Sequence, residues 1–229
     1  MPDMIEYGSK EALAADLAAG IAASLSEAIG ARGRALLAVS GGSTPKPMFE
    51  ALSTIELDWS KVTIVPVDER WVPENHERSN AKLVRDNLLR NEARAAGFVS
   101  IHAPTETPES GMEEVSGRIR ALPLPFDVLT LGMGTDGHTA SFFPGGDNLA
   151  RALTTDTPEL VVPMRAPGAD EPRVTLTLPL VLGARRIVLQ IEGDAKRAVW
   201  ETAKASGDQN EMPVRAVIGA ANLEVVWAP

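Results

Sequence analysis

The sequence contains no cysteine among its 229 residues, which excludes a disulfide framework and any metal site built on thiolates. Aromatic side chains are also scarce, with Trp 4, Tyr 1 and Phe 5, so few rings are present for stacking on nucleic-acid bases. Basic residues are outnumbered, 22 Lys and Arg against 31 Asp and Glu, and the formal net charge is −9. This balance argues against broad binding to nucleic acid or to an anionic membrane, although a small anionic substrate needs only a few local cations.

Long hydrophobic runs and targeting signals are missing as well. No apolar run approaches the roughly 18 residues that span a bilayer, and residues 1–6 show no basic flank before an apolar segment. We therefore expect a cytoplasmic protein without membrane contact. Because no repeat, low-complexity tract or change of composition marks a linker, we also expect residues 1–229 to form a single domain.

Helix-like and strand-like segments alternate along the chain. A long helix is predicted over 9–29, where apolar residues recur every four positions and Ser9 stands as the N-cap. Shorter helices are predicted at 45–52, 79–89, 111–122 and 194–205, and strands at 34–40, 61–67, 126–131, 160–164, 186–191 and 223–227. Apolar strands separated by helices indicate an α/β fold with a mostly parallel sheet covered on both faces.

Ligands of such sheets bind at the carboxyl ends of the strands, so we expect chemistry in the loops after Val39, Val67, Leu131 and Ile191. The first of these loops contains Gly41, Gly42, Ser43 and Thr44 before a predicted helix. Glycines let a ligand approach the backbone, and a helix start offers free N–H groups, so the pattern is typical of a phosphate site. It lacks the Gly-Lys-Ser/Thr ending of a Walker loop, and a simple helix-capping turn is an equally good interpretation.

The loop after Val67 begins with three charged residues, which are not expected in a core. Arg70 offers a bidentate clamp for a phosphate, and Asp68 offers acid–base chemistry or the orientation of a partner. Taken alone, the same residues also fit a solvated loop with a surface ion pair. Two further candidate cations are Arg173 and Lys196, the latter in the first turn of a predicted helix.

The loop after Leu131 places His138 among several glycines at an expected loop–helix junction. An imidazole is a suitable general base near neutral pH, because histidine in model peptides has a pKa of about 6.5. Asp136 is close enough in sequence to orient His138. The alternatives are a histidine that only caps a helix and a dinucleotide loop of the G-x-G-x-x-G type. Residues 144–146 leave little room for the helix that such a loop requires.

Other site types are not supported. The three histidines show no paired metal-ligand spacing, and Ala38 stands where a nucleophile elbow around Ser40 would need glycine.

Together, these motifs resemble the 6-phosphogluconolactonase family. The resemblance is carried by Ser-Gly-Gly-Ser-Thr-Pro at 40–45, Asp-Glu-Arg-Trp-Val-Pro at 68–73, Ser-Asn at 79–80, and the segments 132–144, 173–178 and 193–196. It implies a three-layer α/β/α fold of the Rossmann-like sugar-phosphate isomerase type. It also implies hydrolysis of 6-phospho-D-glucono-1,5-lactone to 6-phospho-D-gluconate in the oxidative pentose phosphate pathway, without a metal or an organic cofactor.

The resemblance further implies that His138 is the general base and that Arg70, Arg173 and Lys196 bind the phosphate. We expect a monomer or a weak homodimer. Glucosamine-6-phosphate deaminase, a relative with the same implied fold, has a glutamate where this chain has Phe143. That glutamate assists proton transfer in the deaminase, so its replacement favours the lactonase. A non-catalytic sugar-phosphate sensor is the remaining alternative, and it would not need His138.

Overall fold

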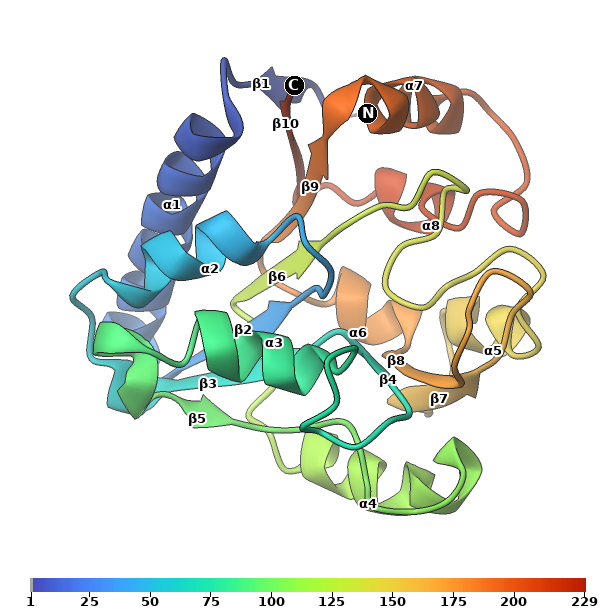
Figure 1. Cartoon of the computed structure of the whole chain (residues 1–229), viewed down its shortest axis with the longest axis horizontal. Coiled ribbons are helices and arrows are strands. Elements are labelled where there is room, and N and C mark those ends of the chain that lie inside the picture. The colour runs from blue at the N-terminus through green and yellow to red at the C-terminus, as the bar shows by residue number, and fades with distance from the viewer. Residues whose placement is uncertain (1) are drawn as a thin grey trace.

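The computed structural model describes residues 2–229, which build two β-sheets and the helices around them (Figure 1). The main sheet has 7 strands in the order β1-β10-β9-β6-β2-β3-β5, and every pair of neighbours is parallel. Its strands are β1 (Met4–Glu6), β2 (Ala35–Val39), β3 (Val62–Pro66), β5 (Gly97–Phe98), β6 (Val128–Leu131), β9 (Ile187–Glu192) and β10 (Leu223–Ala228). The predicted α/β fold with a mostly parallel sheet is therefore confirmed.

Helices cover both faces of this sheet (Figure 1). The helices are α1 (Lys10–Arg32), α2 (Lys46–Ser53), α3 (Asn80–Asn87), α4 (Pro108–Arg120), α5 (Leu149–Leu153), α6 (Leu178–Leu182), α7 (Gly193–Lys204) and α8 (Arg215–Ile218), with short 3-10 turns at Trp59–Lys61 and Asn91–Ala95. Alternate residues of β2 enter two separate cores: Leu37 and Val39 pack with α1, α2 and α3, while Leu36 and Ala38 pack with α4 to α8. This alternation follows from the period of two along a strand.

Helix α1 begins and ends near the predicted positions. The Ser9 side chain accepts a hydrogen bond from the Ala12 N–H, and Gly33 closes the helix with φ 73. By length and mean hydropathy of 1.4 this helix is apolar enough to cross a membrane, although charged residues such as Asp16 and Glu27 interrupt its apolar runs. Residues such as Leu17 and Ile21 are buried against the sheet, which is how an apolar helix packs in a protein core.

A second, smaller sheet corrects the predicted topology. Strands β4 (Asp68–Arg70), β8 (Arg173–Leu176) and β7 (Val161–Met164) form an antiparallel sheet in the order β4-β8-β7. The strand predicted at 160–164 lies here rather than in the main sheet, and the segment expected as a loop after Val67 is itself a strand. As a result, Arg70 stands directly opposite Arg173.

Candidate active site

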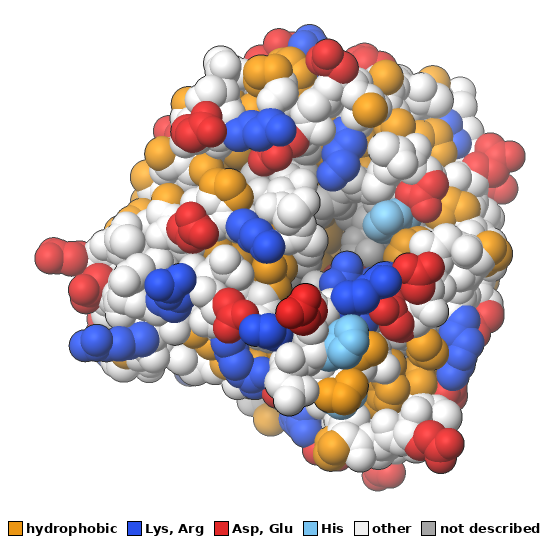
Figure 2. All heavy atoms as spheres, viewed as in Figure 1, with side chains coloured by type: hydrophobic (Ala, Val, Ile, Leu, Met, Phe, Trp, Pro, Cys, Tyr) orange, Lys and Arg blue, Asp and Glu red, His pale blue; other side chains and the backbone are white. Residues whose placement is uncertain are grey.

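The loops singled out from the sequence meet at one edge of the main sheet. Strands β9, β6, β2 and β3 are consecutive neighbours, so their carboxyl ends bring these loops together, as expected. They surround a pocket of about 300 Å³. The face drawn in Figure 2 is hollowed near its centre, with His, Lys and Arg side chains around the hollow. The lining includes Ser40, Gly41, Gly42, Ser43, Thr44, Asp68, Arg70, Asn80, Gly134, His138, Phe143, Gly168, Arg173, Gln190 and Lys196.

The structure thus brings nearly all of the predicted site residues to one pocket. His138, Asp68, the three cations and the four residues of the first loop line it directly. Asp136 does not line the pocket and instead contacts His138 from outside it.

His138 and Asp136 form a close pair. The ring Nδ1 lies 2.6 Å from Asp136 Oδ1, and the same oxygen accepts a hydrogen bond from the His138 backbone N–H at 3.1 Å. Burial opposes ionisation of Asp136, but the hydrogen bonds and the charge of His138 outweigh it and lower the pKa of the carboxyl. Because an ionised carboxylate only accepts, Nδ1 is the donor and Nε2 is left as the basic nitrogen.

The loop that carries this pair is a tight turn. The Gly134 N–H donates to the His138 carbonyl at 2.9 Å, and Gly137 has φ 79, which favours glycine. The Val214 N–H donates to the Gly137 carbonyl and ties the turn to the chain before α8. The next helix, α5, begins only at Leu149. The expected loop–helix junction at His138 is therefore wrong, and the turn lacks the helix that a dinucleotide loop needs.

Phe143 forms an apolar wall beside the pair. Its ring centroid lies 4.4 Å from that of His138 at an interplanar angle of 34°. The Arg173 guanidinium lies 5.5 Å from the same ring, within the range of a cation–π contact. The same aromatic ring therefore contacts both the imidazole and a buried cation.

The two arginines of the small sheet each keep one buried nitrogen without a hydrogen-bond partner among the described residues. Arg173 has a side chain 8% exposed, and burial lowers its pKa, although Asp68 and Glu171 act in the opposite direction. The Nε of Arg173 and the Nε of Arg70 are buried and find no hydrogen-bond partner within residues 2–229. Unpaired buried donors on cations are costly, so this end of the pocket is suited to an anion.

Lys196 reaches the pocket from the first turn of α7. Burial lowers the pKa of its ammonium group, while the nearby Glu192 acts in the opposite direction. The cation is thus withdrawn from bulk solvent, where its attraction for an anion is screened less.

The charged residues after Val67 were not expected in the core, but Asp68 and Glu69 are both buried. Glu69 is 0% exposed and accepts hydrogen bonds from the backbone of Arg70, Asn80 and Ala81 and from the Ser79 hydroxyl. Burial raises the pKa of Glu69, and these hydrogen bonds act against that rise. Its carboxylate anchors the start of α3. Asp68, which is also buried, accepts a hydrogen bond from the Ser141 hydroxyl at 2.6 Å.

The glycine loop after β2 lies against α3. A Cβ added to Gly41 would lie 1.9 Å from Asn80 Oδ1, so only glycine fits at this position. Gly42 has φ 91, and the Thr44 carbonyl accepts a hydrogen bond from the Gln190 side chain at 3.2 Å. These contacts fix the loop at the start of α2, beside the pocket.

Sequence reasoning did not assign Asn80 or Gln190 to the pocket, and it treated Phe143 only as the replacement for the deaminase glutamate. Asn80 belongs to the Ser-Asn pair at 79–80, but nothing in that pair assigns it to a pocket. Gln190 lies inside an apolar strand, where a polar residue 3% exposed is a signal of a specific contact. Within the part of the chain that the structure describes, no group of three or more His, Asp or Glu is placed to hold a metal ion.

Comparison with known proteins agrees with the motifs. The family model described as glucosamine-6-phosphate isomerases/6-phosphogluconolactonase matches residues 8–227. The chain belongs to this family. A 6-phosphogluconolactonase of Rhizobium meliloti is 52% identical over 225 residues, which cover 97% of both chains. One of Pseudomonas aeruginosa is 44% identical, covering 97% of this chain and 93% of the relative.

Solved structures of the family have the same fold. A 6-phosphogluconolactonase from Shewanella baltica superposes with a TM-score of 0.97 at 40% identity, over 100% of this chain and 98% of that one. A monomeric glucosamine-6-phosphate deaminase superposes with a TM-score of 0.79 at 18% identity, over 100% and 97% of the two chains. At that identity the likeness extends to the fold alone. The relatives with high identity therefore lie on the lactonase side of the family.

Proposed function

We propose that this chain hydrolyses 6-phospho-D-glucono-1,5-lactone to 6-phospho-D-gluconate. The observation that carries the proposal is the His138–Asp136 pair at 2.6 Å, set in a pocket that is also lined by three cations. The pair is suited to the activation of a water molecule, and the cations are suited to binding a phosphate. Relatives with 35% to 52% identity that are named for this activity support it.

In the proposed reaction, His138 Nε2 takes a proton from a water molecule as the water oxygen attacks C1 of the lactone. Asp136 holds the ring and stabilises the imidazolium that forms. When the tetrahedral intermediate collapses, the bond from C1 to the ring oxygen breaks and the imidazolium returns its proton to that oxygen. The products are a free hydroxyl and a carboxylic acid, which ionises at neutral pH.

The developing oxyanion at C1 needs nearby N–H donors. Two N–H groups of the turn are already engaged, since the Gly134 N–H donates to the His138 carbonyl and the Gly137 N–H donates to the Gly134 carbonyl. The backbone of Gly41, Gly42 and Gly132 lines the pocket as well. We infer that the oxyanion donors come from these remaining glycines.

The deaminase alternative has less support. Phe143, at the position of the deaminase glutamate, stacks on His138 and offers no proton-transfer group. A non-catalytic sensor would have no use for an aspartate hydrogen-bonded to an imidazole. The lactonase is therefore the function that the site supports best.

Hydrolysis of freshly prepared lactone in a pH-stat tests the proposal. We expect acid release well above the spontaneous opening of the lactone, measured without enzyme in the same buffer. Ammonia release from glucosamine 6-phosphate, measured in parallel, would instead favour the deaminase. No acceleration above the spontaneous rate would contradict the proposal.

Arg70→Ala is expected to weaken substrate binding. Removing a charged hydrogen-bond donor costs roughly 1.5–3 kcal/mol, so KM for the phosphorylated lactone should rise about tenfold or more. Initial rates over a range of lactone concentrations give KM and kcat separately. An unchanged KM would remove Arg70 from the phosphate site.

A further inference from the structure

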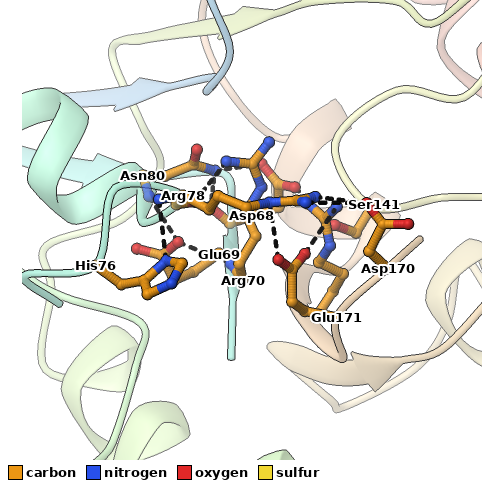
Figure 3. A network of polar contacts seen from close by, with 10 residues as sticks. Asp68, Glu69, Arg70, His76, Arg78, Asn80, Ser141, Asp170 and Glu171 are labelled. Atoms are coloured by element: carbon orange, nitrogen blue, oxygen red, sulfur yellow. Dashed lines mark hydrogen bonds and ion pairs between the residues drawn. The ribbon is translucent and has the colours of Figure 1, made fainter. Parts of the chain in front are cut away.

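An exposed arginine connects two loops beside the pocket. Arg78, in the segment between β4 and α3, donates from both terminal nitrogens to Asp170 Oδ2 at 2.9 Å. Its Nε lies 2.8 Å from Glu171 Oε1 (Figure 3). Asp170 and Glu171 belong to the loop before β8, which also carries the pocket residue Gly168. Arg78 thus ties together the loop that follows β4 and the loop that precedes β8, which lie at the same end of the small sheet.

Glu171 lies between two cations and is bonded to only one of them. Its Oε1 pairs with Arg78, whereas its Oε2 lies 3.9 Å from an Arg173 terminal nitrogen. That distance is too long for a hydrogen bond. Oε2 is buried and has no hydrogen-bond partner within residues 2–229, as is also true of Arg173 Nε. The Glu171 carboxylate therefore lies close to Arg173 without forming a hydrogen bond to it.

In this arrangement, two anions can compete to pair with the Arg173 guanidinium. Arg173 has the carboxylates of Asp68 and Glu171 nearby but no hydrogen bond from its Nε, so it gains by pairing closely with any anion that can reach it. The substrate phosphate is one such anion under the proposed function, and Glu171 is another. The Arg78 guanidinium holds one oxygen of Glu171 and so restrains the carboxylate from turning fully towards Arg173.

We propose that Arg78 is a positioning residue that keeps Glu171 away from Arg173 and thereby leaves Arg173 open to the phosphate of the substrate. The inference rests on the proposed function and adds a determinant of substrate affinity outside the pocket lining. The Arg78 carbonyl also accepts a hydrogen bond from Arg70 at 2.6 Å. This backbone contact persists when only the side chain is replaced.

Arg78→Ala tests the inference. We expect the Kd of the product 6-phosphogluconate, measured by calorimetry, and KM for the lactone to rise roughly tenfold, a coupling typical of neighbouring charges. The kcat should change little, since His138 and Asp136 are untouched. Adding Glu171→Gln to this variant should return Kd and KM towards the wild-type values, because a neutral amide does not compete with the phosphate.

Arg165→Ala is the matched control. Arg165 stands near the start of the same loop, pairs with Glu109, and has a side chain 43% exposed against 45% for Arg78. It does not contact Glu171, so its loss should leave Kd near the wild-type value. Melting curves of all variants establish that they are folded. If Arg78→Ala is unfolded, the single variants Arg78→Lys and Glu171→Gln replace it, with an intermediate Kd expected for the first and no weakening for the second.

Three results would overturn the inference. One is a double variant that binds the product no better than Arg78→Ala. Another is an Arg165→Ala variant that loses as much affinity, which would mean that Arg78 only stiffens the loop. The third is weaker product binding by Glu171→Gln alone. Each is distinct from failure of the proposed function, which would appear as absence of lactone hydrolysis by the unmodified protein.

Discussion

Replacing His138 by alanine is expected to lower kcat by about 10²–10⁴-fold, the usual contribution of a positioned general base. Among the described residues 2–229, the pocket lining holds two groups able to accept a proton from water, His138 and Asp68. The other charged lining residues are Arg70, Arg173 and Lys196. KM should change much less than kcat, because the cations that face the phosphate remain. Pre-formed lactone, followed in a pH-stat with subtraction of the spontaneous rate, gives both constants.

The control for His138→Ala is the melting temperature of the variant, which shows whether it is still folded. The side chain is 31% exposed and packs mainly against Phe143 and Asp136, so the melting temperature should change little. Asp68→Asn provides the competing test, because Asp68 is the other pocket residue able to accept a proton. A His138→Ala variant with full kcat, together with an inactive Asp68→Asn variant, would transfer the role of base to Asp68.

The main sheet was predictable because its central strands carry a strong signal. Strands β2, β3, β6 and β9 are apolar runs ended by glycine or charged residues, and each lies within two residues of its predicted bounds. The small sheet was not predictable in this way. Strand β4 consists of three charged residues, and its pairing with β8 depends on residues more than a hundred positions away. Such pairing leaves no local pattern.

The candidate site was predictable at the level of residue types at strand ends. Local spacing indicated that Asp136 could orient His138, and the structure brings their side chains together. Burial was less predictable, because Glu69 is enclosed by the start of α3, a contact between separate segments. For the same reason, the sequence alone does not reveal the link between Arg78 and Glu171, which are far apart in sequence and act on a third residue, Arg173. Networks of this kind depend on tertiary structure alone.

The net charge of −9 is consistent with an anionic substrate because the relevant cations are few and enclosed. Arg173 is buried, and Lys196 is partly withdrawn from solvent, so their fields are screened less than those of surface charges. Acidic residues elsewhere act through solvent and salt, which weakens their repulsion of the substrate. The charge that matters for binding is therefore the local one.

Gly134→Ala is expected to reduce kcat nearly as much as loss of His138 itself, again on the order of 10²-fold or more. A Cβ at this position would lie 2.2 Å from His138 Nδ1 and 2.5 Å from Asp136 Oδ1. Neither distance is sterically possible, so the methyl group must separate the two side chains or displace the turn. The change removes no catalytic group and adds no charge. A large loss of kcat would therefore measure the orientation of the imidazole.

The proton on His138 Nδ1, which lies in a short contact to a carboxylate, provides the direct measurement. We expect the NMR spectrum of the unmodified protein to show a downfield resonance for this proton. In Gly134→Ala this resonance should be lost. Gly132→Ala is the matched control for this resonance, because a Cβ at Gly132 meets nothing within 4 Å, and the pair should remain intact. A Gly134→Ala variant that keeps both the resonance and its kcat would show that the turn adapts without moving the pair. Catalysis would then not depend on the close packing of Gly134 against His138 and Asp136.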